Sequence, residues 1–454
     1  MSNFCDYIKK YVYLFTFYNQ VSVILDIFLI FAELLGYHMY TTKYLPNTRL
    51  QVADALRGIA IVGIILLHNI EHLNFFHFPE ATNGVIIFLD KVTNSGLHFV
   101  LKDKTYSIFA MMFGLSFFIQ NDNQMQRGKD FTLRFIWRMF LLLIFGLMNS
   151  FFFDGDILFT YAMFGMLLPF VSKLSTKTIA IIACFLLLQP VEIYKIINAW
   201  LNLNYPVPNF DSVKYLNIMM TSQEHGTIWE SGWNNIRYSR LLCLAWDIDS
   251  GRITQLPGLF LLGMLLGRLR LFYNEKNNLK TWGGILVLAF VIFIPTYILS
   301  GQLPGLIFRN EILVPARILF RLWNSLAQTF IYVSVLALLF YSFQTINRWM
   351  LQFTFLGRAS MTNYFLQSIL GALIYYGWGF ALYRYCGFFF SFLIGIGVVV
   401  VQYLFCRWWF KTHKHGPMEG IWKKLTWINF KFEYFTSMFL SKTHGHFQPP
   451  PSAR

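Results

Sequence analysis

Long runs of apolar residues recur along the chain and are separated by short polar tracts. A helix of about 20 apolar residues is long enough to cross the hydrocarbon core of a bilayer. Only helices and closed barrels satisfy their own backbone hydrogen bonds there. The pattern predicts an all-α, polytopic transmembrane helix bundle with about ten spans, centred on residues 52–72, 105–120, 134–153, 157–172, 178–195, 255–271, 283–300, 324–344, 362–380 and 388–409.

The N-terminal stretch at residues 11–36 is also apolar and long enough to cross. It contains Asp26 and Glu33, whose charges are costly in lipid. An eleventh span and a helix lying in the interface therefore fit about equally well. We expect an N-terminal extension at 1–45, a transmembrane bundle at 46–410 with an outer segment at 196–253, and a cytoplasmic tail at 411–454 with an interfacial helix.

Composition strengthens the membrane assignment. Charged residues make up 13% of the chain and apolar residues 56%, whereas charged residues are about 25% of an ordinary soluble domain. The net charge of +15 would suit a nucleic acid, but the basic residues stand at the ends of the apolar runs and form no continuous basic face. We expect the lipid bilayer as a partner, and no nucleic acid.

The basic residues also predict an orientation. They cluster after the second, fourth, sixth and eighth runs and in the C-terminal tail, and the positive-inside rule places such clusters in the cytoplasm. Both ends of the bundle are then cytoplasmic, and residues 73–104, 196–253 and 301–323 face outward. The outward segments contain Arg309, Arg317 and Arg321, which either break the statistical rule or form an anion site.

One stripe of the first predicted helix carries nearly all of its ionisable residues. Arg57 and His68 are eleven residues apart, so they differ by about 20° around a helix and by roughly 16 Å along it. Asp54, Glu71 and His72 fall near the same line. Because charges avoid lipid, this stripe faces the bundle interior or a water-filled cavity. A purely structural role, in packing and topology, is the alternative.

The chemistry of the stripe suits acyl transfer. A histidine beside a carboxylate such as Glu71 can take a proton from a hydroxyl or amine near neutral pH. Arg57, at the cytoplasmic end, suits a phosphate. Phosphate recognition inside and a base further out fit transfer of an acyl group from a cytosolic thioester to an outer acceptor. Zinc on His68 and His72 is a rival, but no third ligand is evident, and we expect no metal.

Several further motifs resemble the YeiB-like family of bacterial membrane proteins over roughly residues 50–428. They are Arg57-Gly58 followed by His68-Asn69, the Lys104–Gly114 run, the Asp154-Gly155-Asp156 turn, Leu356–Ser368, and Gly416–Trp422. The C-terminal part of this family is a domain of unknown function. The resemblance implies a bacterial cytoplasmic (inner) membrane protein.

The family is itself similar to transmembrane acyltransferases, including acyltransferase family three and the lysosomal heparan-α-glucosaminide acetyltransferase. In acyltransferase family three, a histidine follows the Arg of an Arg-Gly pair by eleven residues, and His68 stands at that spacing here. YeiB-like proteins more often carry Asn at this place, and Asn69 follows directly. The resemblance favours His68 and then His72 as the catalytic histidine, with His77 and His98 as competitors.

Other candidate binding residues have structural alternatives. Asp154 and Asp156 flank a turn-favouring glycine, yet two outer carboxylates could orient a catalytic imidazole. Arg358, Asn363 and Gln367 open the ninth run, where polar residues commonly join helices by hydrogen bonds. Gly416–Lys424 reads as an amphipathic interfacial helix.

Two functions from different classes follow. The first is an acyltransferase that moves an acyl group from cytosolic acyl-CoA, as a co-substrate and not a tightly bound cofactor, to an extracytoplasmic small-molecule, glycan or lipid acceptor. The second is a transporter or lipid-handling protein, in which spans broken by proline or glycine would open alternately to the two sides.

Overall fold

The computed structural model describes residues 50–71, 73–75, 83–206, 208, 210–273 and 276–428. The side chains of residues 276 and 277 are not among those described. The predicted N-terminal span or interfacial helix lies outside these ranges, as do His72, His77 and the end of the tail. Every regular element within them is helical, which confirms the all-α class.

The first half of the described chain forms nine α-helices. They are α2 (Gln51–Glu71), α3 (Gly84–Leu101), α4 (Lys104–Met125), α5 (Thr132–Ser150), α6 (Leu158–Gly165), α7 (Leu168–Val171), α8 (Thr176–Leu187), α9 (Pro190–Leu201) and α10 (Ser212–His225).

The second half forms eight α-helices and one 3-10 turn. They are α11 (Ile228–Asp249), α12 (Arg252–Arg268), α13 (Lys276–Leu306), α14 (Asn310–Ser342), α15 (Gln344–Arg358), α16 (Ser360–Tyr375), η1 (Leu382–Arg384), α17 (Phe388–Trp409) and α18 (Pro417–Thr426).

All ten predicted apolar runs fall on helices, but the predicted number of spans is not confirmed. Six helices of the described chain are long and apolar enough to cross a membrane, or seven if the bent pair α8–α9 is one span. The run at 157–172 is divided between α6 and α7, and α12 and α16 have only 17 and 16 residues. Residues 301–323, expected in an outer segment, instead continue the long helices α13 and α14.

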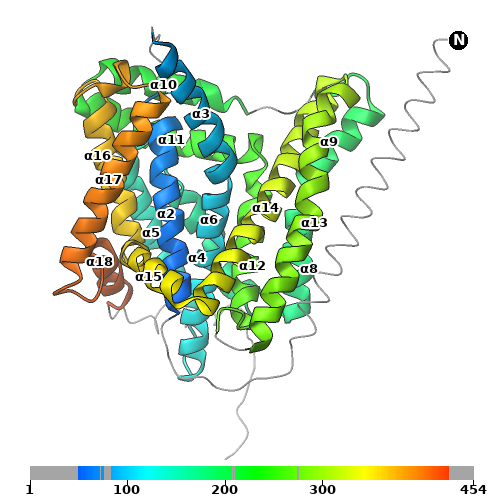
Figure 1. Cartoon of the computed structure of the whole chain (residues 1–454), viewed down its shortest axis with the longest axis vertical. Coiled ribbons are helices and arrows are strands. Elements are labelled where there is room, and N and C mark those ends of the chain that lie inside the picture. Colours follow the sequence, from blue (N-terminus) through cyan, green and yellow to red (C-terminus); the bar gives the residue numbers. More distant parts are fainter. Residues whose placement is uncertain are drawn as a thin grey trace, which may run out of the picture.

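The helix α2 stands inside the bundle, with α4, α15, α16 and α17 around it (Figure 1). The hairpin of α13 and α14 lies to one side, together with α8 and α9. The short helix α18 lies at the end of the bundle where α2 begins, whereas α10 lies at the opposite end (Figure 1). We call these the α18 end and the α10 end.

Close approach of two backbones explains one pair of the sequence motifs. A Cβ atom added to Gly58 would overlap the carbonyl oxygen of Phe353, and one added to Gly357 would overlap that of Asp54. The Arg57-Gly58 and Gly357-Arg358 pairs therefore meet at a single crossing of α2 and α15. Only residues without a side chain allow helices to pack this closely.

The helix α18 forms where an interfacial helix was predicted, and it is docked on the bundle. Glu419 accepts hydrogen bonds from the backbone N–H of Met361 (2.7 Å) and of Thr362 (3.1 Å), and from the Thr362 hydroxyl (2.6 Å). Its carboxylate thus satisfies N–H groups that the first turn of α16 leaves unpaired. On the other side of α18, the Trp422 indole donates to the Arg138 carbonyl, and the Arg138 guanidinium lies 3.7 Å from the centre of the indole ring.

Candidate functional site

A cavity of about 130 Å³ lies between four parts of the bundle. Its walls are the last turns of α2, the beginning of α4, the α5–α6 turn together with α6, and the α11–α12 junction. A buried water needs roughly 10–15 Å³ of such space. The cavity therefore has room for several waters or for a small organic group.

His68 lines this cavity from the last turn of α2. Its ring packs against Phe153, with 4.7 Å between ring centroids, and edge-on to Tyr364 at 6.3 Å. Two aromatic neighbours fix the plane of the imidazole. The structure thus places the favoured histidine at a cavity wall, in an orientation held by packing.

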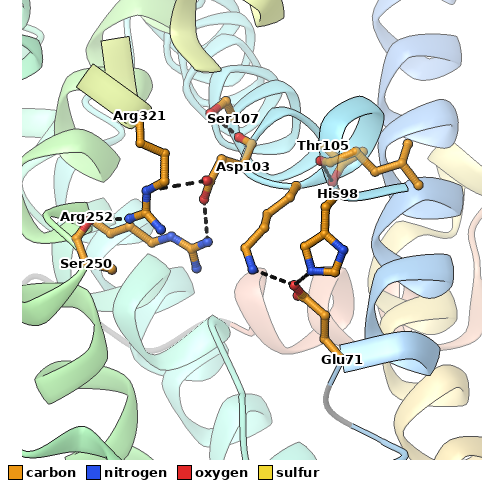
Figure 2. Close-up of polar contacts among 10 residues, drawn as sticks. Glu71, His98, Asp103, Thr105, Ser107, Ser250, Arg252 and Arg321 are labelled. Atoms are coloured by element: carbon orange, nitrogen blue, oxygen red, sulfur yellow. Dashed lines mark hydrogen bonds and ion pairs between the residues drawn. The ribbon is translucent and has the colours of Figure 1, made fainter. Parts of the chain in front are cut away.

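Glu71 also lines the cavity, and it is the centre of a small ion cluster (Figure 2). Its Oε1 lies 2.7 Å from Lys102 Nζ and 2.7 Å from His98 Nε2. The other ring nitrogen of His98 lies 2.7 Å from the Asn94 carbonyl oxygen. Contacts within the protein thus occupy both ring nitrogens of His98. This arrangement favours His68 over His98.

A second charge cluster follows directly in the sequence, at Asp103. Arg252 Nη2 donates to Asp103 Oδ1 at 2.7 Å, and Arg321 Nε lies 3.9 Å from Asp103 Oδ2 (Figure 2). Arg321 also donates to the carbonyl of Ser250. One carboxylate thus shares two guanidinium groups, which leaves this cluster with a surplus positive charge. Arg321, one of the three arginines of the segment expected outside, is therefore paired within the protein.

Five polar atoms around the cavity are buried and have no hydrogen-bond partner among the described residues. They are the hydroxyls of Tyr106, Thr160 and Tyr161, Oδ2 of Asp247, and Nε of Arg252. More than 90% of buried polar groups in proteins are paired with protein or ordered water. A group of unpaired atoms around one cavity therefore indicates that a polar ligand or solvent completes their hydrogen bonds.

Burial changes the acidity of two carboxyl groups near this cavity, both outside the candidate spans. It raises the pKa of Asp247 to about 6, an increase that the positive charge of Arg252 limits. It raises the pKa of Asp156 to about 7, although hydrogen bonds from Asn149 and from backbone N–H groups oppose the increase. Both values bring a proton exchange close to physiological pH.

The remaining residues predicted at the outer side lie close to this cavity. Asp156 accepts from the Leu158 N–H at 2.6 Å and so caps the beginning of α6. Asp154 is buried, and its carbonyl accepts a long hydrogen bond from the Cys243 thiol. Gly155, between the two aspartates, lines the cavity. Asn69 points away along its own helix and donates to the Ile65 carbonyl.

The predicted phosphate-binding residues lie nearer the α18 end. Arg57 donates to Asp54 Oδ1 at 2.9 Å and to the Ser116 hydroxyl at 2.6 Å. The guanidinium is therefore held between two helices, α2 and α4. The structure places Arg57 and His68 on the same helix but does not bring them together in one cavity.

The polar residues of α15 and α16 make contacts within the protein. Arg358 donates to the Lys414 carbonyl and lies over the ring of Phe410. Asn363 donates to the Leu356 carbonyl and accepts from the Cys406 thiol. Gln367 is buried, and its amide has no hydrogen-bond partner within the described residues.

Sequence reasoning missed the α11–α12 wall and the tyrosines. Tyr106 belongs to the Lys104–Gly114 run, but nothing in that run distinguishes its hydroxyl from those of interfacial tyrosines. Asp247 and Arg252 lie in the segment expected outside the membrane, where charges are ordinary. The one available signal was an acidic and a basic residue on either side of Ser250-Gly251, a turn that brings the ends of two helices together.

The fold and the cavity define a class: a helical membrane protein with a buried polar site. Residues 49–219 match the family described as "Heparan-alpha-glucosaminide N-acetyltransferase, catalytic", and residues 266–429 match "Protein of unknown function (DUF418)". The first match contains His68, Glu71, Tyr106 and Tyr161. The segment with Asp247 and Arg252 lies between the two matches.

Three relatives align with nearly the whole chain. "Uncharacterized protein YxaH" of Bacillus subtilis is 26% identical over 421 residues, covering 85% of this chain and 96% of its own. "Uncharacterized protein YeiB" of Escherichia coli is 24% identical over 396 residues, covering 82% and 95%. "Uncharacterized 39.9 kDa protein in amylase 3'region" of Bacillus acidopullulyticus is 24% identical, covering 85% and 96%. These matches confirm the resemblance to the YeiB-like family.

Proposed function

We propose that this protein is a transmembrane acyltransferase that moves an acyl group from cytosolic acyl-CoA to an acceptor on the outer side of a bacterial cytoplasmic membrane. The observation that carries the proposal is the cavity in which His68 meets several buried polar groups. The match of residues 49–219 to an acetyltransferase catalytic family supports it. In this orientation the α18 end and the C-terminus face the cytoplasm.

His68 acts as the general base in the proposed reaction. It takes the proton of the acceptor hydroxyl or amine, whose oxygen or nitrogen forms a bond to the carbonyl carbon of the thioester. The carbon–sulfur bond then breaks, and CoA leaves as a thiolate that regains a proton. A positioned base of this kind accelerates transfer by about 10²–10⁴-fold. Glu71 lies on the same helix, three residues after His68, and its Oε1 lies 2.7 Å from Lys102 Nζ. This ion pair places both charges at the wall of the cavity.

Arg57 is proposed to hold a phosphate of acyl-CoA at the cytoplasmic side. Arg57 and His68 are separated by roughly 16 Å along the helix. The extended arm of acyl-CoA, with phosphates at one end and the thioester at the other, spans this separation. Asp54 and Ser116 hold the guanidinium in place for this contact. Bidentate binding of phosphate is a property of Arg that Lys does not share.

The test uses purified protein in proteoliposomes, with acetyl-CoA outside and a bacterial envelope extract as the source of acceptors. Release of free CoA thiol is followed by a colorimetric thiol reagent, and the acetylated product is identified by mass spectrometry. We expect His68→Ala to lower turnover about 100-fold or more. The control is His225→Ala, because the His225 side chain is 67% exposed. Full turnover in His68→Ala would exclude His68 as the base.

Transport is the second candidate, and one observation favours it. The pair α8–α9 bends by 47° at Gln189-Pro190, and broken helices line the substrate sites of many transporters. A transporter would carry a labelled envelope metabolite across the vesicle membrane without releasing CoA thiol. Uptake without thiol release would therefore replace the acyltransferase proposal.

A further inference from the structure

The α11–α12 wall of the cavity carries two opposite charges that do not pair with each other. Asp247 is near the end of α11 and Arg252 is the first residue of α12; the Ser250-Gly251 turn joins them, with Gly251 at φ 76°. Both line the cavity. Among the described residues, neither a hydrogen bond nor an ion pair within 4.0 Å links the two side chains. A gap between buried opposite charges is unusual, because pairing would stabilise both.

Other contacts hold Arg252 in its place. Its Nη2 donates to Asp103, and its guanidinium lies 4.9 Å from the centre of the Tyr106 ring. Its Nε is buried and has no acceptor among the described residues, and Oδ2 of Asp247 has no donor there. The cavity thus presents an unused strong donor and an unused strong acceptor on one wall.

These two groups together select the chemistry of a ligand. An ammonium group donates hydrogen bonds but accepts none, so it pairs with Asp247 and leaves Arg252 facing another donor. A carboxylate or phosphate accepts but does not donate, so it pairs with Arg252 and opposes Asp247. A hydroxyl both donates and accepts. It alone among these groups satisfies both residues without bringing a net charge into the bundle.

We propose that the cavity binds a neutral hydroxyl group of the acyl acceptor between Asp247 and Arg252, so that the acceptor is a polyhydroxylated molecule, bound through one hydroxyl and acylated at another group. The acceptor role rests on the proposed acyltransferase function, whereas the preference for a neutral hydroxyl does not. Asp247 accepts the only proton of the bound hydroxyl, so this hydroxyl positions the acceptor. His68 takes the proton of the group that is acylated. Residues 220–265 lie outside both family matches, so this wall is a feature of the chain that those matches do not supply.

A native cysteine allows the preference to be measured without knowledge of the acceptor. Cys243 lines the same cavity, one turn before Asp247. Three methanethiosulfonate reagents of equal length, ending in a hydroxyl, an ammonium or a carboxylate, each form a disulfide with the thiolate and release methanesulfinate. Rates at Cys243 are obtained by peptide mass spectrometry of the intact protein in detergent, and each is divided by the rate with free cysteine. The ratios between reagents do not depend on the pKa of Cys243.

We expect the hydroxyl reagent to react about tenfold faster than either charged reagent, because the ammonium opposes Arg252 and the carboxylate opposes Asp247 inside a buried cavity. Asp247→Asn should raise the relative rate of the carboxylate reagent, and Arg252→Gln that of the ammonium reagent, each about tenfold. Asp249→Asn, two residues after Asp247, is the matched control and should change neither ratio. If Arg252→Gln loses its monodisperse elution peak, Asp247→Asn, which keeps the side-chain shape, decides alone.

Three outcomes would overturn the preference for a hydroxyl. Two are equal normalised rates for the three reagents and a fastest reaction with a charged reagent. The third is no labelling of Cys243 by any reagent, which would mean that the cavity holds water only. A second arm separates this inference from the proposed function. Acyl transfer to simple acceptors with no second hydroxyl, at a KM no higher than that for polyhydroxylated acceptors, would leave the acyltransferase intact and refute the hydroxyl. Hydroxyl preference at Cys243 without any acyl transfer would do the reverse.

Discussion

Polar residues near the two ends of α2 differ in how fully their hydrogen bonds are satisfied. At the α18 end, Arg57 is bonded to Asp54 and Ser116, and Glu419 accepts three hydrogen bonds from the first turn of α16. Around the cavity toward the α10 end, strong donors and acceptors such as Arg252 Nε and Asp247 Oδ2 have no partner among the described residues. The first set joins helices, although Arg57 uses only two of its five N–H donors in these contacts and keeps others for the proposed phosphate. The second set has whole donor and acceptor atoms left for a ligand.

This contrast separates two kinds of motif that look alike in a sequence. A charged residue in a membrane segment is a functional candidate by default. In this protein, however, the most distinctive motifs at the α18 end lock α2, α15, α16 and α18 together. The cavity is distinguished by several unpaired polar atoms that surround one space, whereas the unpaired amide of Gln367 does not line it.

The largest effect should come from the helix crossing at the α18 end. Gly58→Val places two methyl groups and a Cβ where the Phe353 carbonyl now lies, so α2 and α15 must separate. We expect a loss of roughly 3 kcal/mol or more in stability, at the upper end of overpacking costs, and little monodisperse protein by size-exclusion chromatography. Gly397→Val is the control, because no atom lies within 4 Å of a Cβ at that position. Equal melting temperatures for the two variants would contradict this view of the crossing.

A smaller loss of stability is expected when the cap of α16 is removed. Glu419→Ala deletes the acceptor of three hydrogen bonds and leaves buried N–H groups unpaired, which costs about 2–3 kcal/mol. Turnover per folded molecule should stay within about twofold, because the carboxylate serves packing at the end remote from the cavity. Thermal melting and the thiol-release assay measure the two quantities. Glu311→Ala, at a side chain that is 43% exposed, is the matched control.

Much of the fold followed from the sequence because apolar length and helical periodicity are local properties. All ten predicted runs are helical, and His68 does line a cavity. The number of spans did not follow, because whether a helix such as α12 or α16 crosses depends on its neighbours and not on its own hydropathy. Hydropathy also could not show that α13 and α14 continue through residues 301–323.

The site followed from the sequence only in part, for a different reason. His68 and Glu71 share one helix, so their spacing was readable from helical geometry. Asp247, Arg252 and Tyr161 reach the cavity from other helices, and tertiary packing alone brings them to His68. Which donor and acceptor groups remain without a partner is likewise a property of the assembled bundle.

At the cavity, pH should change ligand affinity. The pKa of Asp247 is raised to about 6 from an ordinary value of 3.8, so this carboxyl is protonated at pH 5 and ionised at pH 7. A charged acceptor makes the stronger hydrogen bond to a hydroxyl. The KM for an alcohol acceptor should therefore fall as pH rises from 5 to 7, by up to about tenfold for one ionisation. Asp247→Asn should flatten this dependence, and a midpoint that persists near pH 6 in that variant would assign it elsewhere.

The smallest change in stability should accompany Tyr161→Phe. This variant tests most directly whether a polar group of the cavity stabilises the fold or binds a ligand. The Tyr161 hydroxyl is buried and has no partner among the described residues, so its removal breaks no bond within the protein. Stability should stay within about 0.5 kcal/mol or increase slightly, because an unsatisfied buried group is itself costly. The KM for the acceptor should rise about fivefold, as expected for the loss of one hydrogen bond of about 1 kcal/mol. Tyr297→Phe, at a side chain that is 50% exposed, controls for the loss of a hydroxyl as such. If the Tyr161→Phe protein is less stable and binds the acceptor normally, the hydroxyl has a structural role, like the paired groups at the α18 end.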